Sequence, residues 1–186
     1  MITTWHSYHG SHEQTEHDQQ PAIRWTPQDS GHSRHVTTTV WVPPVVVAGW
    51  ITVEDADPDE PWDGIRLHLG HMGNNRNYVV DLVRPDGDMV ISREYGWRGY
   101  DDLNRTSDGL DLTEWGTYLV RVEWGTDRIV AEVANEIATK TLAADIDLEA
   151  KQGEHEGSHV PRIPAGAVGW RLDHLTAVGQ LTVREL

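Results

Sequence analysis

The residues best suited to chemistry are an arginine, a histidine and two carboxylates in one stretch of the chain. Arg66 and His68 alternate with apolar residues, and Asp81 and Glu94 lie in the two alternating runs that follow. A histidine beside a carboxylate has the acid and base range for hydrolysis, elimination or cyclisation near neutral pH. His68, Asp81 and Glu94 are therefore candidate catalytic residues, and ordinary polar residues of a sheet surface are the alternative.

The segment from Arg93 to Leu103 combines aromatic and charged side chains around two glycines. Sugars are held by stacking their apolar C–H faces on Trp or Tyr rings, while arginines and carboxylates bond to the hydroxyls. The same composition also suits a loop that its aromatic side chains pin to the rim of a sandwich. The candidate ligand-binding residues are Arg66, Arg93, Tyr95, Trp97, Arg98 and Tyr100.

An acidic stretch from Asp55 to Gly64 holds five carboxylates and two prolines. Calcium takes oxygen ligands from loops of this composition, so Asp55, Asp57 and Asp59 are candidate calcium ligands. The stretch lacks the fixed spacing of an EF-hand, and a solvated acidic loop is the alternative. Thiolate metal sites are excluded because the chain has no cysteine.

The charge balance limits the partners that the chain can bind. It has 30 acidic and 15 basic residues, which gives a formal net charge of −15. Nucleic acids and anionic membranes attract clustered Lys and Arg, so we expect neither as a partner. A long acidic polysaccharide is disfavoured as well, unless a local arginine patch overrides the overall field. A carbohydrate or another small polar molecule is the expected partner.

Alternating runs of residues must position these side chains. Between Trp115 and Leu142 two runs of period two flank a Gly-Thr-Asp turn, which indicates a β-hairpin half-buried against a core. From Gly64 to Glu94 three more alternating runs are joined by turns, one of them at Asp86-Gly87, and they predict an antiparallel meander. Residues 142–152 show no sustained period, so we expect a loop or a short helical turn there.

Strict alternation assigns each residue of the meander to one side of its sheet. It places Arg66 and His68 outward and the apolar residues between them inward. It also places Asp81 outward, together with Val79 and Val83. The last run is expected to point Met89 and Ile91 inward, and Val90, Ser92 and Glu94 outward.

The chain has the length of one domain with a polar beginning. Residues 1–35 are rich in histidine, and we expect them to form a lead-in packed on or beside a sandwich that comprises residues 36–186. Residues 36–42 are rich in β-branched types and predict a strand that ends at Pro43-Pro44. The first residues lack a basic segment followed by an apolar one, so the chain, if full length, is expected in the cytoplasm.

Three stretches, taken in their order, resemble the concanavalin A-like lectin/glucanase superfamily, and particularly its laminin-G-like and 3-keto-disaccharide-hydrolase-like jelly rolls. They are the meander at 62–94, the Trp-led hairpin at 115–136 and a closing pair of strands at 164–186. The resemblance implies an all-β fold, a two-sheet antiparallel jelly-roll sandwich. The chain departs from the relatives at Ala134-Asn135, where they carry Asp-Gly, and it has no Glu-x-Asp-x-x-Glu run of the retaining glucanases.

The resemblance extends to the fold and not to the function. The polar residues of the meander and the aromatic segment beside them favour a carbohydrate-recognition or carbohydrate-active domain that binds a sugar or a similar polar molecule on its concave sheet face. One alternative is a small intracellular hydrolase, lyase or cyclase that uses the His/carboxylate/Arg site on the same face. Another is an assembly domain whose exposed aromatic residues pack against a second chain. Because this fold hosts many functions, the choice depends on the geometry of the site.

Overall fold

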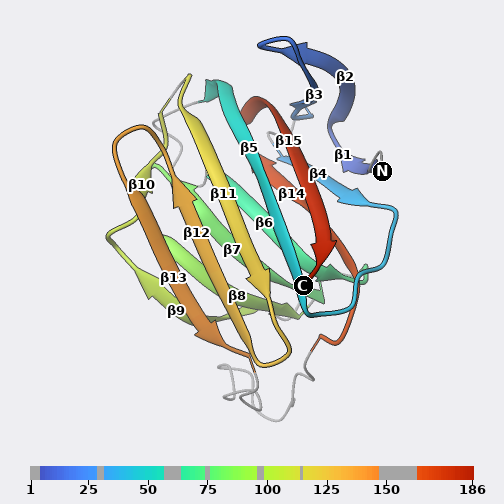
Figure 1. Cartoon of the computed structure of the whole chain (residues 1–186), viewed down its shortest axis with the longest axis vertical. Helices are drawn as coiled ribbons and strands as arrows, with labels where there is room; N and C mark the ends of the chain where they lie inside the picture. Colours follow the sequence, from blue (N-terminus) through green and yellow to red (C-terminus); the bar gives the residue numbers. More distant parts are fainter. Residues whose placement is uncertain are drawn as a thin grey trace.

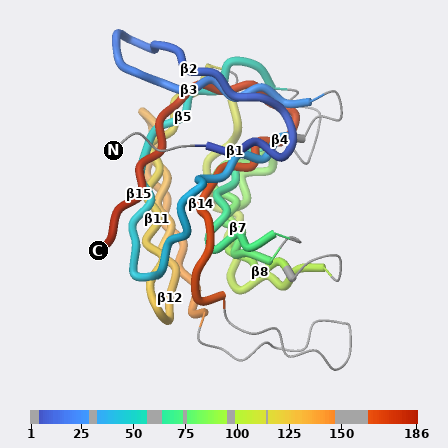
Figure 2. The backbone as a smooth tube through the Cα atoms, turned by 90° about the vertical axis from the view of Figure 1, so that its right-hand side faces the viewer, coloured from blue at the N-terminus to red at the C-terminus, as the bar shows by residue number. Residues whose placement is uncertain are grey.

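The fold is a sandwich of two stacked sheets, seen face-on in Figure 1 and edge-on in Figure 2. The computed structural model describes residues 5–28, 32–56, 64–73, 76–95, 99–113, 115–146 and 163–186. Two sheets of eight and seven strands confirm the predicted all-β, two-sheet jelly roll. Sheet A has the order β1 (Trp5–His9), β4 (His32–Thr37), β14 (Ala167–Asp173), β6 (Gly64–His71), β7 (Arg76–Arg84), β8 (Met89–Tyr95) and β9 (Tyr100–Thr106), with β10 (Leu110–Asp111) beside β7.

Sheet B contains the hairpin that the sequence predicted. Its order is β13 (Thr139–Asp145), β12 (Arg128–Ala134), β11 (Thr117–Trp124), β5 (Val45–Ala56), β15 (Leu175–Glu185), β3 (Gln20–Thr26) and β2 (Ser11–His17). β11 and β12 pair as the predicted hairpin, from Leu119 opposite Ala134 to Trp124 opposite Ile129. The loop or helical turn expected from residue 142 is wrong for its first residues, because β13 pairs along β12 as far as Asp145.

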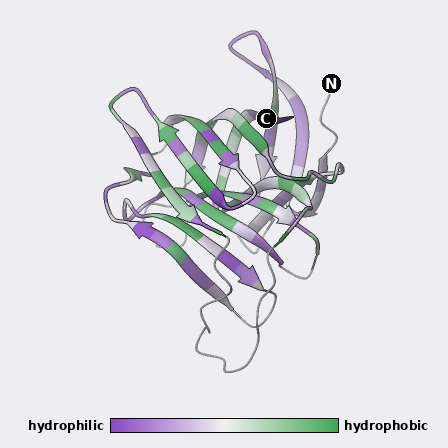
Figure 3. Ribbon diagram, turned by 60° about the horizontal axis from the view of Figure 1, so that its bottom comes forward, coloured by the Kyte–Doolittle hydropathy of each residue, from purple (hydrophilic) through white to green (hydrophobic). Residues whose placement is uncertain are grey.

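Indole and phenol rings fill the space between the sheets, since the chain has no phenylalanine. Trp25, Trp124, Trp170, Tyr78 and Tyr118 are all fully buried. The rings of Trp25 and Trp170 meet edge-to-face with their centroids 6.3 Å apart, an arrangement that aromatic quadrupoles favour. Figure 3 shows the alternation behind this core as bands of opposite hydropathy along the strands.

The polar beginning of the chain contributes strands to both sheets. β1 pairs with β4 in sheet A, whereas β2 and β3 extend sheet B beyond β15. Trp5 and Trp25 anchor these strands in the core. The expected boundary at residue 35 lies inside β4. The bounds of the strand expected at 36–42 are wrong: β4 begins at His32 and ends at Thr37, and Trp41 makes an isolated bridge to Gly166.

A β-bulge in β7 changes which side chains reach the outer face of sheet A. Opposite Ile65 and Arg66 of β6, β7 carries one extra residue. Leu82 and Val83 consequently both face the core, so the predicted outward position of Val83 is wrong. Arg84 reaches the outer face instead. Bulges commonly re-aim side chains in this way beside functional sites.

A second bulge acts in the same way in β9. Opposite Ile91 and Ser92 of β8, β9 carries Leu103 as an extra residue. Asp102 and Arg105 therefore both lie on the outer face, although they are three positions apart. Together the two bulges bring two arginines to a surface that strict alternation would have given to other residues.

The first bulge makes a testable difference at Val83. We expect Val83→Glu to lower the free energy of unfolding by about 3–5 kcal/mol, because it places an unpaired charge between the sheets. Leu119, which is 60% exposed on sheet B, provides the control. Leu119→Glu should change stability by less than about 0.5 kcal/mol. Urea denaturation measures both variants, and equal effects would show that Val83 faces solvent.

Candidate functional site

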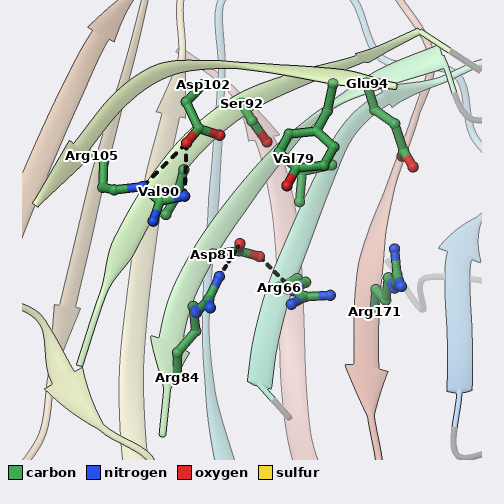
Figure 4. A pocket seen from close by; sticks show the side chains of 11 residues that line it. Arg66, Val79, Asp81, Arg84, Val90, Ser92, Glu94, Asp102, Arg105 and Arg171 are labelled. Atoms are coloured by element: carbon green, nitrogen blue, oxygen red, sulfur yellow. Dashed lines mark hydrogen bonds and ion pairs between the residues drawn. The ribbon is translucent and has the colours of Figure 1, made fainter. Parts of the chain in front are cut away.

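A pocket of about 260 Å³ opens on the outer face of sheet A (Figure 4). Strands β6, β7, β8, β9 and β14 all contribute to its lining. Four arginines and three carboxylates dominate it, with few apolar side chains between them. The lining residues are Arg66, Val79, Asp81, Arg84, Val90, Ser92, Glu94, Tyr100, Asp102, Arg105 and Arg171.

Arg66 holds the carboxylates at the base of the pocket. Its Nε lies 2.6 Å from Oδ1 of Asp81, and its Nη1 donates to Oδ2 of Asp173 at 2.5 Å. Nε of Arg171 donates to the other oxygen of Asp173 at 3.0 Å. Burial raises the pKa of Asp81, while the charges of Arg66 and Arg84 oppose that shift. The two charge-assisted hydrogen bonds to Asp173 and the ion pair between Arg66 and Asp81 fix the positions of the groups at the base.

The two arginines that the bulges bring outward are also paired. Arg84 donates from Nε and Nη2 to the two oxygens of Asp86, at 3.0 and 2.8 Å. Arg105 donates from Nε and Nη2 to Asp102, at 3.1 and 2.8 Å, and from Nη1 to Asp88 at 3.0 Å. The rim of the pocket therefore presents donors and acceptors side by side.

A buried amide positions Glu94. The side chain of Asn77 is fully buried, and its Nδ2 donates to Oε2 of Glu94 at 3.1 Å. Oδ1 of Asn77 lies 3.1 Å from Nδ1 of His71. Burial lowers the pKa of His71, which keeps its ring neutral, so the contact requires the tautomer with a proton on Nδ1. The chain His71–Asn77–Glu94 thus sets the orientation of one carboxylate of the lining.

His68 lies on the predicted face but not at the predicted depth. It is fully buried and is not among the residues that line the pocket. Its pKa is well below the ordinary range, first because of burial and then because of the positive charges of Arg34 and Arg171. The expectation of a solvent-facing His68 is therefore wrong, since neighbouring side chains cover this position. The enzyme alternative required this imidazole at the pocket.

The remaining candidates divide between the pocket, the interior and the parts of the chain that are not described. Tyr100 lines the pocket and is 63% exposed. Arg93 is 2% exposed and does not line it. Trp97, Arg98 and the side chain of Tyr95 lie outside the described residues. The pocket thus brings together Arg66, Asp81, Glu94 and Tyr100 from the predicted set.

The calcium prediction falls largely on residues that are not described. Asp55 is exposed near the end of β5, whereas Asp57 and Asp59 lie outside the described residues. Within the described ranges no group of three or more His, Asp or Glu side chains could hold a metal ion. Calcium binding stays a prediction. The described residues also contain no helix that could span a membrane.

Sequence reasoning missed four charged residues of the lining. The bulges prevented the prediction of Arg84 and Arg105 on the outer face. Asp102 lies in the segment from Arg93 to Leu103 but was not among the candidate residues. Arg171 lies between Trp170 and Leu172, both buried in the core. The alternation of that closing strand was a sufficient signal to place Arg171 on the outer face.

Comparisons with solved structures bear on the fold. Neither a protein-family profile nor a curated protein sequence matches the chain. The carbohydrate-binding module CBM66 from Bacillus subtilis superimposes with a TM-score of 0.65 at 12% identity, over 99% of this chain and 97% of that one. The exoplasmic/lumenal domain of VIP36, in a Ca²⁺/Man3GlcNAc-bound form, gives 0.62 at 11% identity, over 98% and 84%.

A toad ovary galectin in complex with thio-digalactose gives a TM-score of 0.53 at 15% identity, over 83% of this chain and 99% of that one. Identities this low establish the fold alone. The chain has the concanavalin A-like lectin fold, as the resemblance of its sequence implied.

Proposed function

We propose that the protein binds a sugar in the pocket on the outer face of sheet A. The observation that carries this proposal is the lining itself, where paired arginines and carboxylates surround an exposed tyrosine ring. Each sugar hydroxyl both donates and accepts a hydrogen bond, so it fits between a guanidinium and a carboxylate. Tyr100 offers a flat surface to the C–H face of the sugar ring.

The size of the pocket and its accessible ion pair support the proposal. At about 260 Å³ the pocket suits a molecule the size of one or two sugar rings. The side chains of Arg105 and Asp102 are 48% and 32% exposed, so both can reach a ligand. The structural neighbours described above include a carbohydrate-binding module, a mannose-containing complex and a galactoside complex. We do not extend the proposal to catalysis, because His68 does not line the pocket.

A glycan array followed by calorimetry tests the proposal. We expect at least one glycan to bind, and Tyr100→Ala to weaken that binding by about tenfold, which is about 1.4 kcal/mol. Trp115→Ala is the control, because Trp115 is an aromatic residue with 67% exposure in the turn before β11. Binding to no glycan, or equal losses in the two variants, would contradict the proposal.

A further inference from the structure

The carboxylates that line the pocket differ in how their charges are balanced. Asp81 lies beside Arg66 and Asp102 beside Arg105, each within ion-pair distance. Glu94 instead accepts a hydrogen bond from the neutral amide of Asn77. Among the described residues no ion pair at contact distance includes Glu94, although the charge of Arg34 attracts it from farther away. Unlike Asp81 and Asp102, Glu94 therefore has no guanidinium in direct contact with its carboxylate.

The surrounding cluster does not supply a surplus of positive charge. Six carboxylates face five arginines once the partners behind the lining are included. The cluster consists of Arg34, Arg66, Arg84, Arg105, Arg171, Asp81, Asp86, Asp88, Glu94, Asp102 and Asp173. The chain as a whole, this cluster included, carries a formal net charge of −15. The five arginines of this cluster therefore do not outweigh the negative charge around the pocket.

We infer that Glu94 makes the pocket selective for uncharged sugars and excludes sugars that carry a carboxylate. This inference rests on the proposed function. Arg171 lies across from Glu94 in the pocket (Figure 4). Its Nε donates a hydrogen bond to Asp173. A neutral sugar placed between them donates a hydroxyl hydrogen to Glu94 and accepts one from Arg171. A uronate in the same place brings its carboxylate toward Glu94, and like charges close together are strongly disfavoured.

Sugar pairs that differ at one carbon isolate this effect. Methyl glucoside and methyl glucuronide, and likewise methyl galactoside and methyl galacturonide, differ in a CH₂OH group that is replaced by a carboxylate. Each pair is titrated into the wild type, Glu94→Gln and Glu132→Gln. Gln keeps a carbonyl oxygen that accepts from Asn77, so the local structure is preserved. Glu132 is exposed on β12 of sheet B, and its substitution removes the same unit of charge away from the pocket.

We expect the wild type to bind the neutral member of a pair at least about tenfold more tightly. Glu94→Gln should move the neutral-to-acidic ratio about tenfold toward the acidic member, whereas Glu132→Gln leaves it unchanged. Added salt should strengthen binding of the acidic member to the wild type, because it screens the repulsion, and should leave the neutral member unaffected.

The outcomes separate the two proposals. Failure of every glycan to bind, on the array and in these titrations, would overturn the proposed function. A wild-type preference for the acidic member would overturn the selectivity while leaving sugar binding in place. An unchanged ratio in Glu94→Gln, or an equal shift in Glu132→Gln, would show that the selectivity does not depend on Glu94. Other charges of the chain would then be its cause.

Discussion

Replacing Arg66 with methionine should lower the free energy of unfolding by about 3 kcal/mol at neutral pH. Arg66 is 8% exposed, and Asp173, one of its two carboxylate partners, is fully buried. Removing the guanidinium leaves Asp173 and Asp81 desolvated without their main partner. The loss stays at the lower end of the range for broken buried pairs, because Arg84 still attracts Asp81 and Arg171 still bonds to Asp173.

A partly exposed ion pair provides the control. Nε of Arg24 donates to Glu54 at 2.8 Å, and the two side chains are 37% and 20% exposed. Solvent screens such a pair, so Arg24→Met should cost less than about 1 kcal/mol.

The double variant Arg66→Met/Asp173→Asn should recover part of the loss, because it removes a buried charge together with its partner. Urea denaturation of the three variants and the wild type measures the differences. Equal losses for Arg66→Met and Arg24→Met would show that the pair at the base of the pocket is solvated like a surface pair.

Most of the sandwich follows from alternation in the sequence. In β11, Tyr118, Val120, Val122 and Trp124 are buried as predicted, because two-residue alternation beside a glycine turn allows one arrangement of faces. The strand at Thr139–Asp145 escaped prediction because Leu142 is its only large apolar residue. Its place depends on pairing with β12 rather than on its own pattern.

The pocket could be predicted in part, because alternation places single residues but does not place strands next to one another. Glu94 and Asp81 were assigned to the outer face from their own runs. Arg171 joins them because β14 pairs with β6, and the residues of these two strands are far apart in the sequence.

The bulges escaped prediction for a related reason. Leu82 and Val83 have the same apolar character, so the sequence of β7 does not show where one residue is added. Whether a residue is extra depends on the register with the partner strand. No local pattern encodes that register.

Acidification should destabilise the fold through two buried histidines. His35 is fully buried, and burial together with the nearby His12 lowers its pKa from 6.5 to about 4. Burial also lowers the pKa of His68 well below its ordinary value. At mildly acidic pH both imidazole rings stay neutral in the folded chain, and each takes up a proton when the chain unfolds. Their contribution to stability is therefore fully present above about pH 6.5 and is lost as the pH falls toward 4.

The expected loss is large for one residue. The shift of His35 corresponds to a loss on the order of 3 kcal/mol across that range, and His68 adds to it with the same sign. Urea denaturation at several pH values measures the loss. His35→Gln should flatten the profile, because Gln does not titrate and retains a polar atom for Ser7, whose Oγ lies 2.9 Å from Nδ1 of His35. His6→Gln, at an exposed histidine of β1, is the matched control.

The titration of Asp81 changes the stability with pH in the opposite direction from that of the histidines. The difference in stability between variants is therefore more informative than the pH dependence of the wild type alone. The pKa of Asp81 is raised in the fold, mainly by burial. Its contribution is therefore present below the ordinary carboxyl range and is lost as the pH rises through the raised value. This partly offsets the histidines in the wild type but is common to all variants, and it cancels when His35→Gln is compared with wild type. A His35→Gln profile parallel to that of the wild type would show that the imidazole of His35 takes up its proton equally in the folded and unfolded chain.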